Sequence, residues 1–367
     1  MNTLEDLRYF LSDSKIKRIF LLCGNKSFSN SGAKKFLSDH LRNKEINFFI
    51  KQSEFPEISE LIKIIDEIRL FKPDLILAVG GGAIMDYAKI ANVVENKTNL
   101  KDLIINYAYP YKKKFTKLAV IPTTAGSGAE VTSNAVIYVN KIKHSFESEL
   151  LIPDIFFLIP EFLVSAPETI KASAGFDSIA QALESLVSQK SNEKSIEYAT
   201  KSLNISIKNY ISFLKNPNLK NASEMSIAAN LAGKAINISK TTLPHAVSYP
   251  FTALFNISHG HAVSLFFEKF FKFNYDNLYK SEAKFDLKKR YQLIFKLFDV
   301  KNINEFNKII FDFKTKAKLE NDLDKLNINI KTHSEKIING INFLRLKNNP
   351  VKIEQSEIYD IISSKKK

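Results

Sequence analysis

The chain has 367 residues, of which 45% are hydrophobic and 25% are charged, and its formal net charge is +14. This length predicts two or three domains, and the lack of any long uninterrupted apolar run excludes a membrane span. The single cysteine, Cys23, excludes an intramolecular disulfide and a thiolate metal cluster. The N-terminal residues lack the basic start and the apolar core of a secretory signal peptide, so we expect a cytoplasmic protein.

The excess of positive charge suggests nucleic-acid binding, but the sequence shows no basic stripe. The lysines are scattered, and there is neither an arginine-rich helix nor a zinc-finger spacing. We therefore expect a lysine-rich solvated surface and no nucleic-acid partner; a steep salt dependence of DNA binding would indicate the alternative. Such a surface also raises the local concentration of anionic substrates.

Apolar strand-like runs alternate with helical segments in the first part of the chain. The predicted strands are residues 17–23, 46–50, 75–79 and 118–121, and the predicted helices are residues 31–41, 57–71 and 83–94. Strands that alternate with helices are typical of a parallel sheet covered by helices on its faces.

From about residue 166 the pattern changes to helical periodicity. Long helices are predicted over residues 169–188, 191–214, 222–238 and 287–298, and strand-like runs nearly disappear. The sequence thus predicts an α/β domain over residues 1–165 and an all-helical domain over residues 166–367.

Two loops that follow predicted strands have the composition of phosphate-binding loops. Gly80, Gly81 and Gly82 connect the third strand to a helix, and residues 123–128 (TTAGSG) follow the fourth strand. Backbone amides at a glycine-rich helix start can approach and bind an anion. In a parallel sheet both loops lie at the carboxyl edge, where ligands bind. Together they predict a nucleotide site, whereas either loop alone is typical of a plain turn.

Three of the six histidines lie close together in the sequence, at His245, His259 and His261. His245 is predicted to lie on a helix, with Tyr249 one turn later on the same face. Gly260 allows the backbone to come close to whatever these histidines bind. Clustered imidazoles favour a metal site, because neutral imidazole is the commonest transition-metal ligand.

Asp177 would complete an Asp/His/His set with His245 and His259, a mixture that Fe²⁺ or Zn²⁺ accepts. Gln181 lies four residues after Asp177 and would share its helix face. The alternative is structural, with the histidines buried in a core and the aspartate at a helix start. The residues alone leave both interpretations open.

These motifs, in this order, resemble the iron-containing (group III) alcohol dehydrogenase family. The resemblance extends over nearly the whole chain and is carried by VGGGAIMD at residues 79–86, IPTTAGSGAEVT at 121–132, AGFDSIAQALES at 174–185, and PHAVSY…FNISHGHAV at 244–263. It implies an N-terminal dinucleotide-binding α/β domain and a C-terminal helical domain, with the active site in the cleft between them.

The resemblance also implies roles for individual residues. A divalent metal, iron in the first place and zinc or manganese otherwise, is expected on Asp177, Gln181, His245 and His259; Gln181 stands where the family has a histidine. NADPH or NADH is expected to bind at Gly24, Asn25, Lys26, Gly80, Gly81, Gly82, Asp86, Thr123, Thr124 and Ser127. Tyr249 occupies a further family histidine position and, with His261, is the candidate catalytic residue for proton delivery.

The departures from the family pattern match one of its branches. The segments DSIAQALES and AGKAINISKTTLPHAVSY resemble the phosphonoacetaldehyde reductases of phosphonate biosynthesis, which make 2-hydroxyethylphosphonate. A dianionic phosphonate needs cationic and hydroxyl donors. The candidates are Lys234, Lys240, Thr241 and Thr242. The alternative is that both lysines are ordinary surface residues.

The expected reaction is hydride transfer from the nicotinamide to a small anionic aldehyde, with the metal acting as a Lewis acid and Tyr249 or His261 relaying a proton. One alternative is a reductase of another small aldehyde or a 2-oxo acid. Another is a dehydroquinate-synthase-like cyclase, against which Gln181 and the PTTAGSG loop argue. We also expect a homo-oligomer, with a dimer as the simplest form.

The turn after the first strand predicts the choice of nicotinamide. The family commonly has an aspartate there, which binds the ribose of NAD and repels the 2′-phosphate of NADP, whereas residues 23–27 read CGNKS and contain no acid. Lys26 could attract the phosphate and Ser27 could donate to it, so NADPH is expected to be at least as good as NADH. The alternative is that Asn25 binds the ribose and both cofactors are accepted.

Overall fold

The computed structural model describes residues 3–53, 55–95, 98–140 and 142–364. The chain forms two compact units: Met1–Pro167 with Pro217–Ile227, and Glu168–Asn216 with Ala228–Lys367. The second stretch of the first unit, which lies at the start of one long helix and just before it, could not be read from the sequence. The predicted domain boundary between residues 165 and 166 refers to domains that fold independently, and it stays a prediction.

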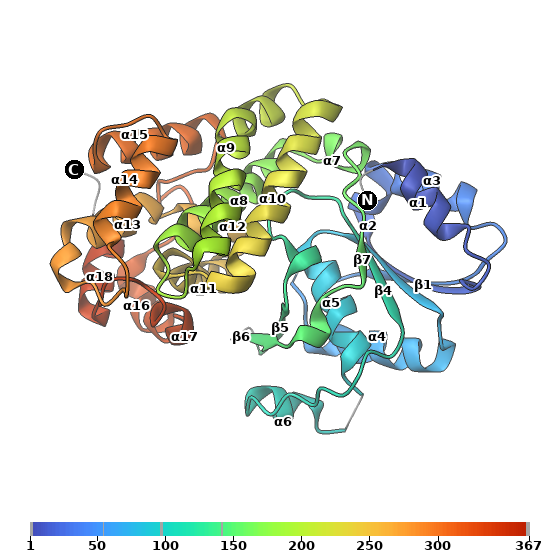
Figure 1. Ribbon diagram of the computed structural model, residues 1–367. Coiled ribbons are helices and arrows are strands. Elements are labelled where there is room, and N and C mark those ends of the chain that lie inside the picture. The colour runs from blue at the N-terminus through green and yellow to red at the C-terminus, as the bar shows by residue number, and fades with distance from the viewer. Residues whose placement is uncertain (1–2, 54, 96–97, 141, 365–367) are drawn as a thin grey trace. The chain divides into compact units, whose positions relative to one another are not determined.

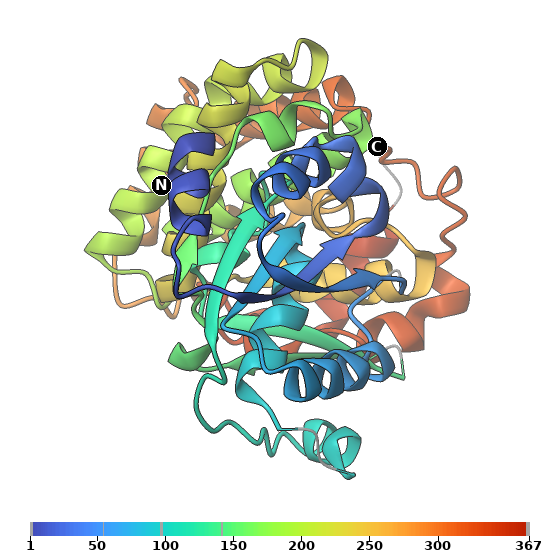
Figure 2. The same cartoon turned by 90° about the vertical axis from the view of Figure 1, so that its right-hand side faces the viewer.

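The first unit is built on a five-stranded parallel sheet in the order β2-β1-β3-β4-β7. Its strands are β1 (Arg18–Gly24), β2 (Glu45–Lys51), β3 (Leu75–Gly80), β4 (Lys117–Pro122) and β7 (Ile155–Phe156). β3 is buried along its whole length, as expected for an interior strand covered on both faces. Figure 2 shows the strands rotated relative to one another, which is the usual twist of such sheets.

Helices follow the strands of this sheet in sequence. They are α1 (Leu4–Leu11), α2 (Asn25–Asn30), α3 (Ala33–His40), α4 (Ile58–Phe71), α5 (Gly82–Val93), α6 (Leu100–Ile105) and α7 (Glu161–Val164), with 3-10 turns η1 (Ala129–Val131) and η2 (Glu149–Leu151). One apolar core joins α4 and α5 to β1, β3 and β4 through residues such as Ile64, Ala88 and Val120. The predicted α/β fold is therefore confirmed, and Figure 1 shows α4 and α5 beside the sheet.

The sequence interpretation missed an antiparallel hairpin in this unit. β5 (Asn134–Val139) pairs with β6 (Ile142–Glu147) and packs on α5. In β6 the buried positions are occupied by His144 and Phe146, so the apolar alternation that identifies a strand is broken by a histidine.

The second unit is helical. It contains α8 (Glu168–Val187), α9 (Glu193–Lys215), most of α10 (Leu219–Ser239), α11 (Leu243–Phe255), α12 (His259–Ser264), α13 (Phe267–Asp276), η3 (Leu278–Lys280), α14 (Leu287–Leu297), α15 (Ile303–Lys316), α16 (Ile330–Asn339), α17 (Phe343–Leu346) and α18 (Gln355–Ser363). In the described part of the chain, no helix combines the length and the apolar character needed to traverse a bilayer.

α8 is the central helix of this unit, and it is buried from Gly175 to Val187. Figure 1 shows α8, α9 and α10 running side by side. Buried serines allow the close approach, because Ser202 of α9 donates to the Ala228 carbonyl of α10 at 2.8 Å and Ser239 of α10 donates to Ser185 of α8 at 2.8 Å. A rigid, buried α8 gives the side chains that it carries fixed positions.

Candidate metal centre and cofactor loops

The two glycine-containing loops of the first unit lie against each other at the carboxyl ends of β3 and β4. The Thr123 amide donates to the Gly80 carbonyl at 3.0 Å. A methyl group on Gly81 would lie 3.4 Å from Thr124 Oγ1, and one on Gly82 would lie 2.8 Å from Ser127 Oγ. The structure thus brings together the two loops that the sequence predicted, and they pack so closely that a larger residue at position 82 would require Ser127 to move.

Both loops retain unused polar groups that suit a phosphate. α5 begins at Gly82, and its N-cap residue Gly81 has no side chain to cap the first amides. Thr123 is 3% exposed, and its hydroxyl has no hydrogen-bond partner among the described residues. Helix-start amides without a side-chain cap bind anions well, and a buried hydroxyl beside them adds a donor, so the loops fit the diphosphate of a dinucleotide.

Lys89, a residue to which the sequence interpretation assigned no role, stabilises the segment after the second loop. Its buried ammonium donates to the Ala129 carbonyl, to Thr132 Oγ1 and to the Asn134 carbonyl at 2.7–3.1 Å. Burial lowers its pKa to about 8. Burial also raises the pKa of the half-buried Asp86 to about 6, against the opposing charge of Lys89. These opposite shifts mark a low-dielectric region beside the loops.

The turn after β1 is the third candidate cofactor segment. Gly24 is the N-cap of α2, and Asn25, Lys26 and Ser27 form its exposed first turn. A methyl group on Gly24 would lie 2.5 Å from Ser27 Oγ. The sequence predicted a turn here rather than a helix start. This turn contains no carboxylate, which is the feature on which the predicted use of NADPH depends.

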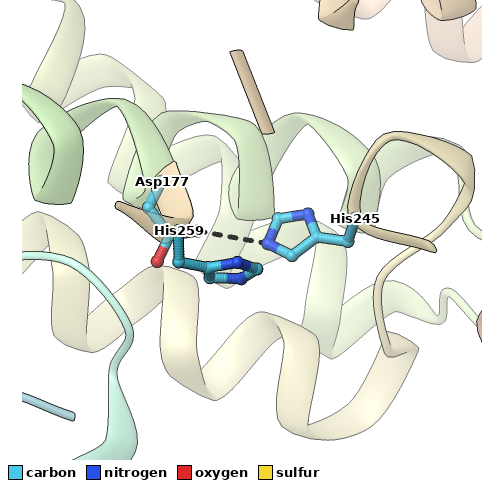
Figure 3. A group of neighbouring side chains, drawn as sticks. All are labelled: Asp177, His245 and His259. Atoms are coloured by element: carbon cyan, nitrogen blue, oxygen red, sulfur yellow. Dashed lines mark hydrogen bonds and ion pairs between the residues drawn. The ribbon is translucent and has the colours of Figure 1, made fainter. Parts of the chain in front are cut away.

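In the second unit, Asp177, His245 and His259 come together from three helices. Asp177 lies on α8, His245 on α11 and His259 at the first position of α12. Each offers one ligand atom, and these atoms all lie within 4.8 Å of one another. His245 Nε2 is 3.1 Å from Asp177 Oδ1, and the two imidazole rings cross at 73° with centroids 5.3 Å apart. Figure 3 shows the three side chains directed toward one another.

Gly260 positions His259 by close contact between α12 and α8. A methyl group at Gly260 would overlap the Ser173 carbonyl oxygen and would lie 2.9 Å from Asp177 Cβ. The neighbouring His261 amide donates to Ser173 Oγ at 3.1 Å. The sequence interpretation had this glycine accommodating a bound ligand; in the structure it accommodates the backbone of α8 instead.

Gln181 provides a further oxygen beside this group. It lies one turn after Asp177 and is 3% exposed, and its Nε2 donates to Asp177 Oδ2 at 3.1 Å. Its Oε1 is buried and has no hydrogen-bond partner among the described residues. A buried acceptor without a donor is costly. A divalent cation at the Asp/His/His group would satisfy it, so the residues fit a metal ion with oxygen and nitrogen ligands.

Glu184 is a buried member of this site that the sequence interpretation did not assign. It is fully buried on α8, and its carboxylate accepts hydrogen bonds from the Thr242 amide at 2.6 Å, from the Thr242 hydroxyl at 2.9 Å, and from His245 Nδ1. Its spacing of seven residues from Asp177, two turns of the same helix face, was the available signal.

Two carboxylates flank His245 and change its protonation. Burial disfavours the charged ring, but Glu184 and Asp177 outweigh it and raise the pKa of His245 to about 10. In the metal-free protein both ring nitrogens therefore carry a hydrogen at neutral pH. A metal ion that binds through Nε2 must displace the hydrogen on that nitrogen, so metal binding releases a proton.

The two candidate proton donors have different surroundings. Tyr249 is 8% exposed, and its ring lies 5.8 Å from that of His259. His261 does not belong to the metal group in the described residues; its Nε2 donates to the Glu320 carbonyl at 2.7 Å, and burial lowers its pKa.

The four candidate phosphonate ligands lie at the end of α10 and the start of α11. The Lys234 ammonium is 6.0 Å from the centre of the Tyr198 ring. Lys240 is half-buried, with a left-handed φ of 59°. Thr241 and Thr242 are buried, and the Thr242 hydroxyl is already bound to Glu184. Thr242 thus has a partner within the protein, which the sequence did not reveal.

A parallel-sheet unit with adjacent loops at the carboxyl ends of its strands suits a nucleotide, and an Asp/His/His group in the helical unit suits a metal ion that acts as a Lewis acid. Two family models match the chain: iron-containing alcohol dehydrogenase over residues 1–160, and the C-terminal part of the Fe-containing alcohol dehydrogenase family over residues 171–365. The chain therefore belongs to the iron-containing alcohol dehydrogenase family, a family of oxidoreductases that use NAD(P) and a divalent metal.

Individual relatives are distant. A 1-propanol dehydrogenase of Citrobacter freundii is 27% identical over 261 residues, which cover 70% of this chain and 67% of the relative. An aldehyde-alcohol dehydrogenase of Streptococcus pneumoniae is 28% identical over 249 residues, which cover 64% of this chain and only 28% of that longer protein.

Solved structures agree in fold over almost the whole chain. A sulfoacetaldehyde reductase from Bifidobacterium kashiwanohense, in complex with NAD⁺, aligns with a TM-score of 0.86 and 24% identity over 98% of this chain and 95% of that one. An iron-containing alcohol dehydrogenase from Thermotoga maritima aligns with a TM-score of 0.82 and 23% identity over 98% and 96%. At these identities the likeness establishes the fold.

Proposed function

We propose that the protein reduces a small aldehyde to an alcohol with NAD(P)H and a divalent metal, and that its substrate is phosphonoacetaldehyde, reduced to 2-hydroxyethylphosphonate. The observation that carries the proposal is the Asp177/His245/His259 group, in which Asp177 and His245 are buried, with the unpaired Gln181 amide oxygen beside it. Membership of the alcohol dehydrogenase family supports the reaction class.

The proposal assigns a role to each of these side chains. A divalent ion held by Asp177, His245 and His259 supplies a Lewis acid for the carbonyl oxygen, and NAD(P)H supplies the hydride. The burial of Asp177 and His245 excludes water from that side of the centre. Tyr249 is the proposed donor of the proton that the new hydroxyl group requires, a role supported by the 5.8 Å between its ring and that of His259. His261 can serve only through Nδ1, because its Nε2 is bound to a carbonyl.

The anionic substrate is the finer part of the proposal. Lys240 directly follows α10 and lies two residues before Thr242, which contacts the Glu184 carboxylate that binds His245. A lysine so close in sequence to the metal helix can meet the charged end of a short substrate. The proposal is supported by the similar fold of the solved sulfoacetaldehyde reductase, a protein named for an aldehyde that also carries an anionic group.

A spectrophotometric assay of NAD(P)H oxidation tests the substrate. Phosphonoacetaldehyde is expected to have a higher kcat/KM than propanal, and Lys240→Ala is expected to remove that preference at a cost of about 2–5 kcal/mol for a lost charged contact. Lys201→Ala is the matched control, since Lys201 is exposed and paired with Glu197. Equal values for the two aldehydes in the native enzyme would refute the phosphonate assignment.

A second candidate substrate is an aldehyde without a phosphonate. The chain is 29% identical over 226 residues to a 4-hydroxybutyrate dehydrogenase of Clostridium kluyveri, which covers 60% of each protein, and it also matches the 1-propanol dehydrogenase above. Succinic semialdehyde, sulfoacetaldehyde and propanal therefore belong in the same assay. A clear preference for one of them would keep the reaction class and replace the substrate.

The assembly and location complete the proposal. We take the active form to be a cytoplasmic homodimer that acts on a small molecule. Light scattering after size-exclusion chromatography measures the molar mass directly; a single species at the mass of one 41.8 kDa chain would refute the dimer.

A further inference from the structure

Glu184 is an unusual residue to find in the interior of a helical unit. Its side chain is fully buried on α8, and a carboxylate in such a place is costly unless donors surround it. Three donors do so: the amide and the hydroxyl of Thr242, both on Oε2, and His245 Nδ1 on Oε1. The two carboxylate oxygens therefore bind different residues: Oε2 binds Thr242, and Oε1 binds His245.

The contact on Oε1 determines which nitrogen of His245 can bind a metal. A carboxylate only accepts hydrogen bonds, so His245 Nδ1 must carry the hydrogen of that contact. When the ring is neutral, its lone pair is then on Nε2. Nε2 is the nitrogen that faces Asp177, at 3.1 Å, and the centre of the Asp/His/His group.

The contacts on Oε2 fix the start of the helix that carries His245. Thr242 is the N-cap of α11, and its own side chain does not cap the helix. It is held instead by Glu184, through both its amide and its hydroxyl, three residues before His245. The Glu184 side chain on α8 thus binds both the N-terminus of α11 and the imidazole of His245.

From this geometry we infer that Glu184 is the positioning residue of the metal centre, which holds His245 in the Nδ1–H tautomer and directs Nε2 to the metal. The inference rests on the proposed metal site. Partners of this kind orient ligand imidazoles and increase their basicity, and their loss typically lowers metal affinity by about 10–100-fold.

Glu184→Gln is the sharpest test, because the amide has the same shape. Its oxygen can still accept from Thr242, but its NH₂ group then faces His245 Nδ1 and favours the tautomer with the hydrogen on Nε2. The affinity for Zn²⁺, measured by competition with a chromophoric chelator, is expected to fall by about 10–100-fold. The melting temperature of the metal-free protein and its binding of NADPH are measured alongside, to show that the fold survives.

Ser185→Ala is the matched control. Ser185 is the next residue on α8, is fully buried, and accepts a hydrogen bond from Ser239 at 2.8 Å. Its replacement removes a buried hydrogen bond from the same helix without touching His245, so zinc affinity should be unchanged. A fall as large as that of Glu184→Gln would mean that any disturbance of α8 weakens the site, and would overturn the specific role of Glu184.

A measurement on the unmodified protein covers the case in which Glu184→Gln does not fold. Nitrogen-15 NMR of the zinc-loaded protein should show His245 with a proton on Nδ1 and zinc on Nε2; the opposite arrangement would overturn the inference. If the native protein binds zinc and Glu184→Gln binds it as tightly, the role of Glu184 is refuted and the metal site stands. If the native protein binds no zinc, the proposed function itself fails, and this inference fails with it.

Discussion

Gln181 distinguishes this centre from one with three histidines, because it presents an amide oxygen where the family pattern has an imidazole. Its Oε1 is buried without a partner, and its Nε2 is bound to Asp177. This arrangement leaves the oxygen free to serve as a harder and weaker ligand than imidazole. The centre should therefore bind zinc less tightly than a three-histidine centre does.

Replacing Gln181 tests this reading of the ligand set. Gln181→His should raise the affinity for Zn²⁺ by at least about tenfold, equivalent to about 1.4 kcal/mol, because a softer ligand replaces the amide. Gln181→Leu, of similar size but without an oxygen, should lower it. Chelator competition measures both variants. Unchanged affinity in both would show that residue 181 does not contact the ion.

Asn25 is the residue on which the choice of nicotinamide is expected to depend. It lies exposed in the first turn of α2, beside Lys26, and no acid is present in that turn to repel a 2′-phosphate. NADPH should be at least as good a substrate as NADH, and Asn25→Asp should shift the ratio of kcat/KM values toward NADH. Steady-state assays with both cofactors at one saturating aldehyde concentration decide it. A strong NADH preference of the native enzyme, or a ratio that Asn25→Asp leaves unchanged, would contradict the prediction.

At the scale of elements, the metal centre depends on two close contacts between helices. Gly260 lets α12 approach α8, as described above. Pro250, inside α11, cannot donate to the Ala246 carbonyl, and the Asn342 amide donates to it instead at 3.2 Å. Gly340 packs so closely there that a methyl group would lie 2.8 Å from Pro250 Cβ. The helix with His245 and Tyr249 is therefore anchored by a segment about ninety residues later in the chain.

Gly260→Ala tests the contact between α12 and α8. The added methyl meets backbone rather than a flexible side chain, so α12 must move; overpacking of this kind costs about 1–3 kcal/mol of stability. The movement carries His259 away from Asp177, so zinc affinity should fall as well. Thermal melting and chelator competition measure the two effects.

Ala262→Gly is the control for this prediction. It lies on the same short helix, is 2% exposed, and weakens the helix by about 1 kcal/mol without a clash. It should lower stability and leave zinc affinity largely intact. Equal losses of zinc affinity in the two variants would show that the stability of α12, and not its distance from α8, controls the site.

These elements also show what the sequence can and cannot predict. β1, β3 and β4 were predicted within one residue because each is an apolar run that ends at a turn residue. Residue type and spacing suggested that Asp177, His245 and His259 gather but left a structural interpretation open, and the family resemblance implied the ligand set. The role of Glu184 was not predicted: its seven-residue spacing from Asp177 indicates a shared helix face, but its contacts with Thr242 and His245 depend on how α8 packs on α11. The same holds for the fit of Gly260 against Ser173.

For the whole molecule, the candidate metal ligands and cofactor loops belong to different compact units. Every candidate ligand lies within Glu168–Lys367, and every candidate loop lies within Met1–Pro167. Because each site is assembled from contacts inside its own unit, disturbing one should leave binding at the other unaffected. Turnover should nevertheless need both, since hydride and Lewis acid are supplied separately.

Removal of the metal is the test of this division. A chelator, or His259→Ala, should abolish aldehyde reduction and leave NADPH binding unchanged. The fluorescence of the reduced nicotinamide measures this binding. Gly82→Ala should weaken NADPH binding, and turnover with it, because its methyl group would lie 2.8 Å from Ser127 Oγ in the cofactor loops, whereas zinc affinity should be retained. Full activity of a metal-free preparation would refute a role for the metal in the reaction. If His259→Ala weakened NADPH binding as much as Gly82→Ala does, the two sites would not be independent, because a change at the metal site would then alter binding in the other unit.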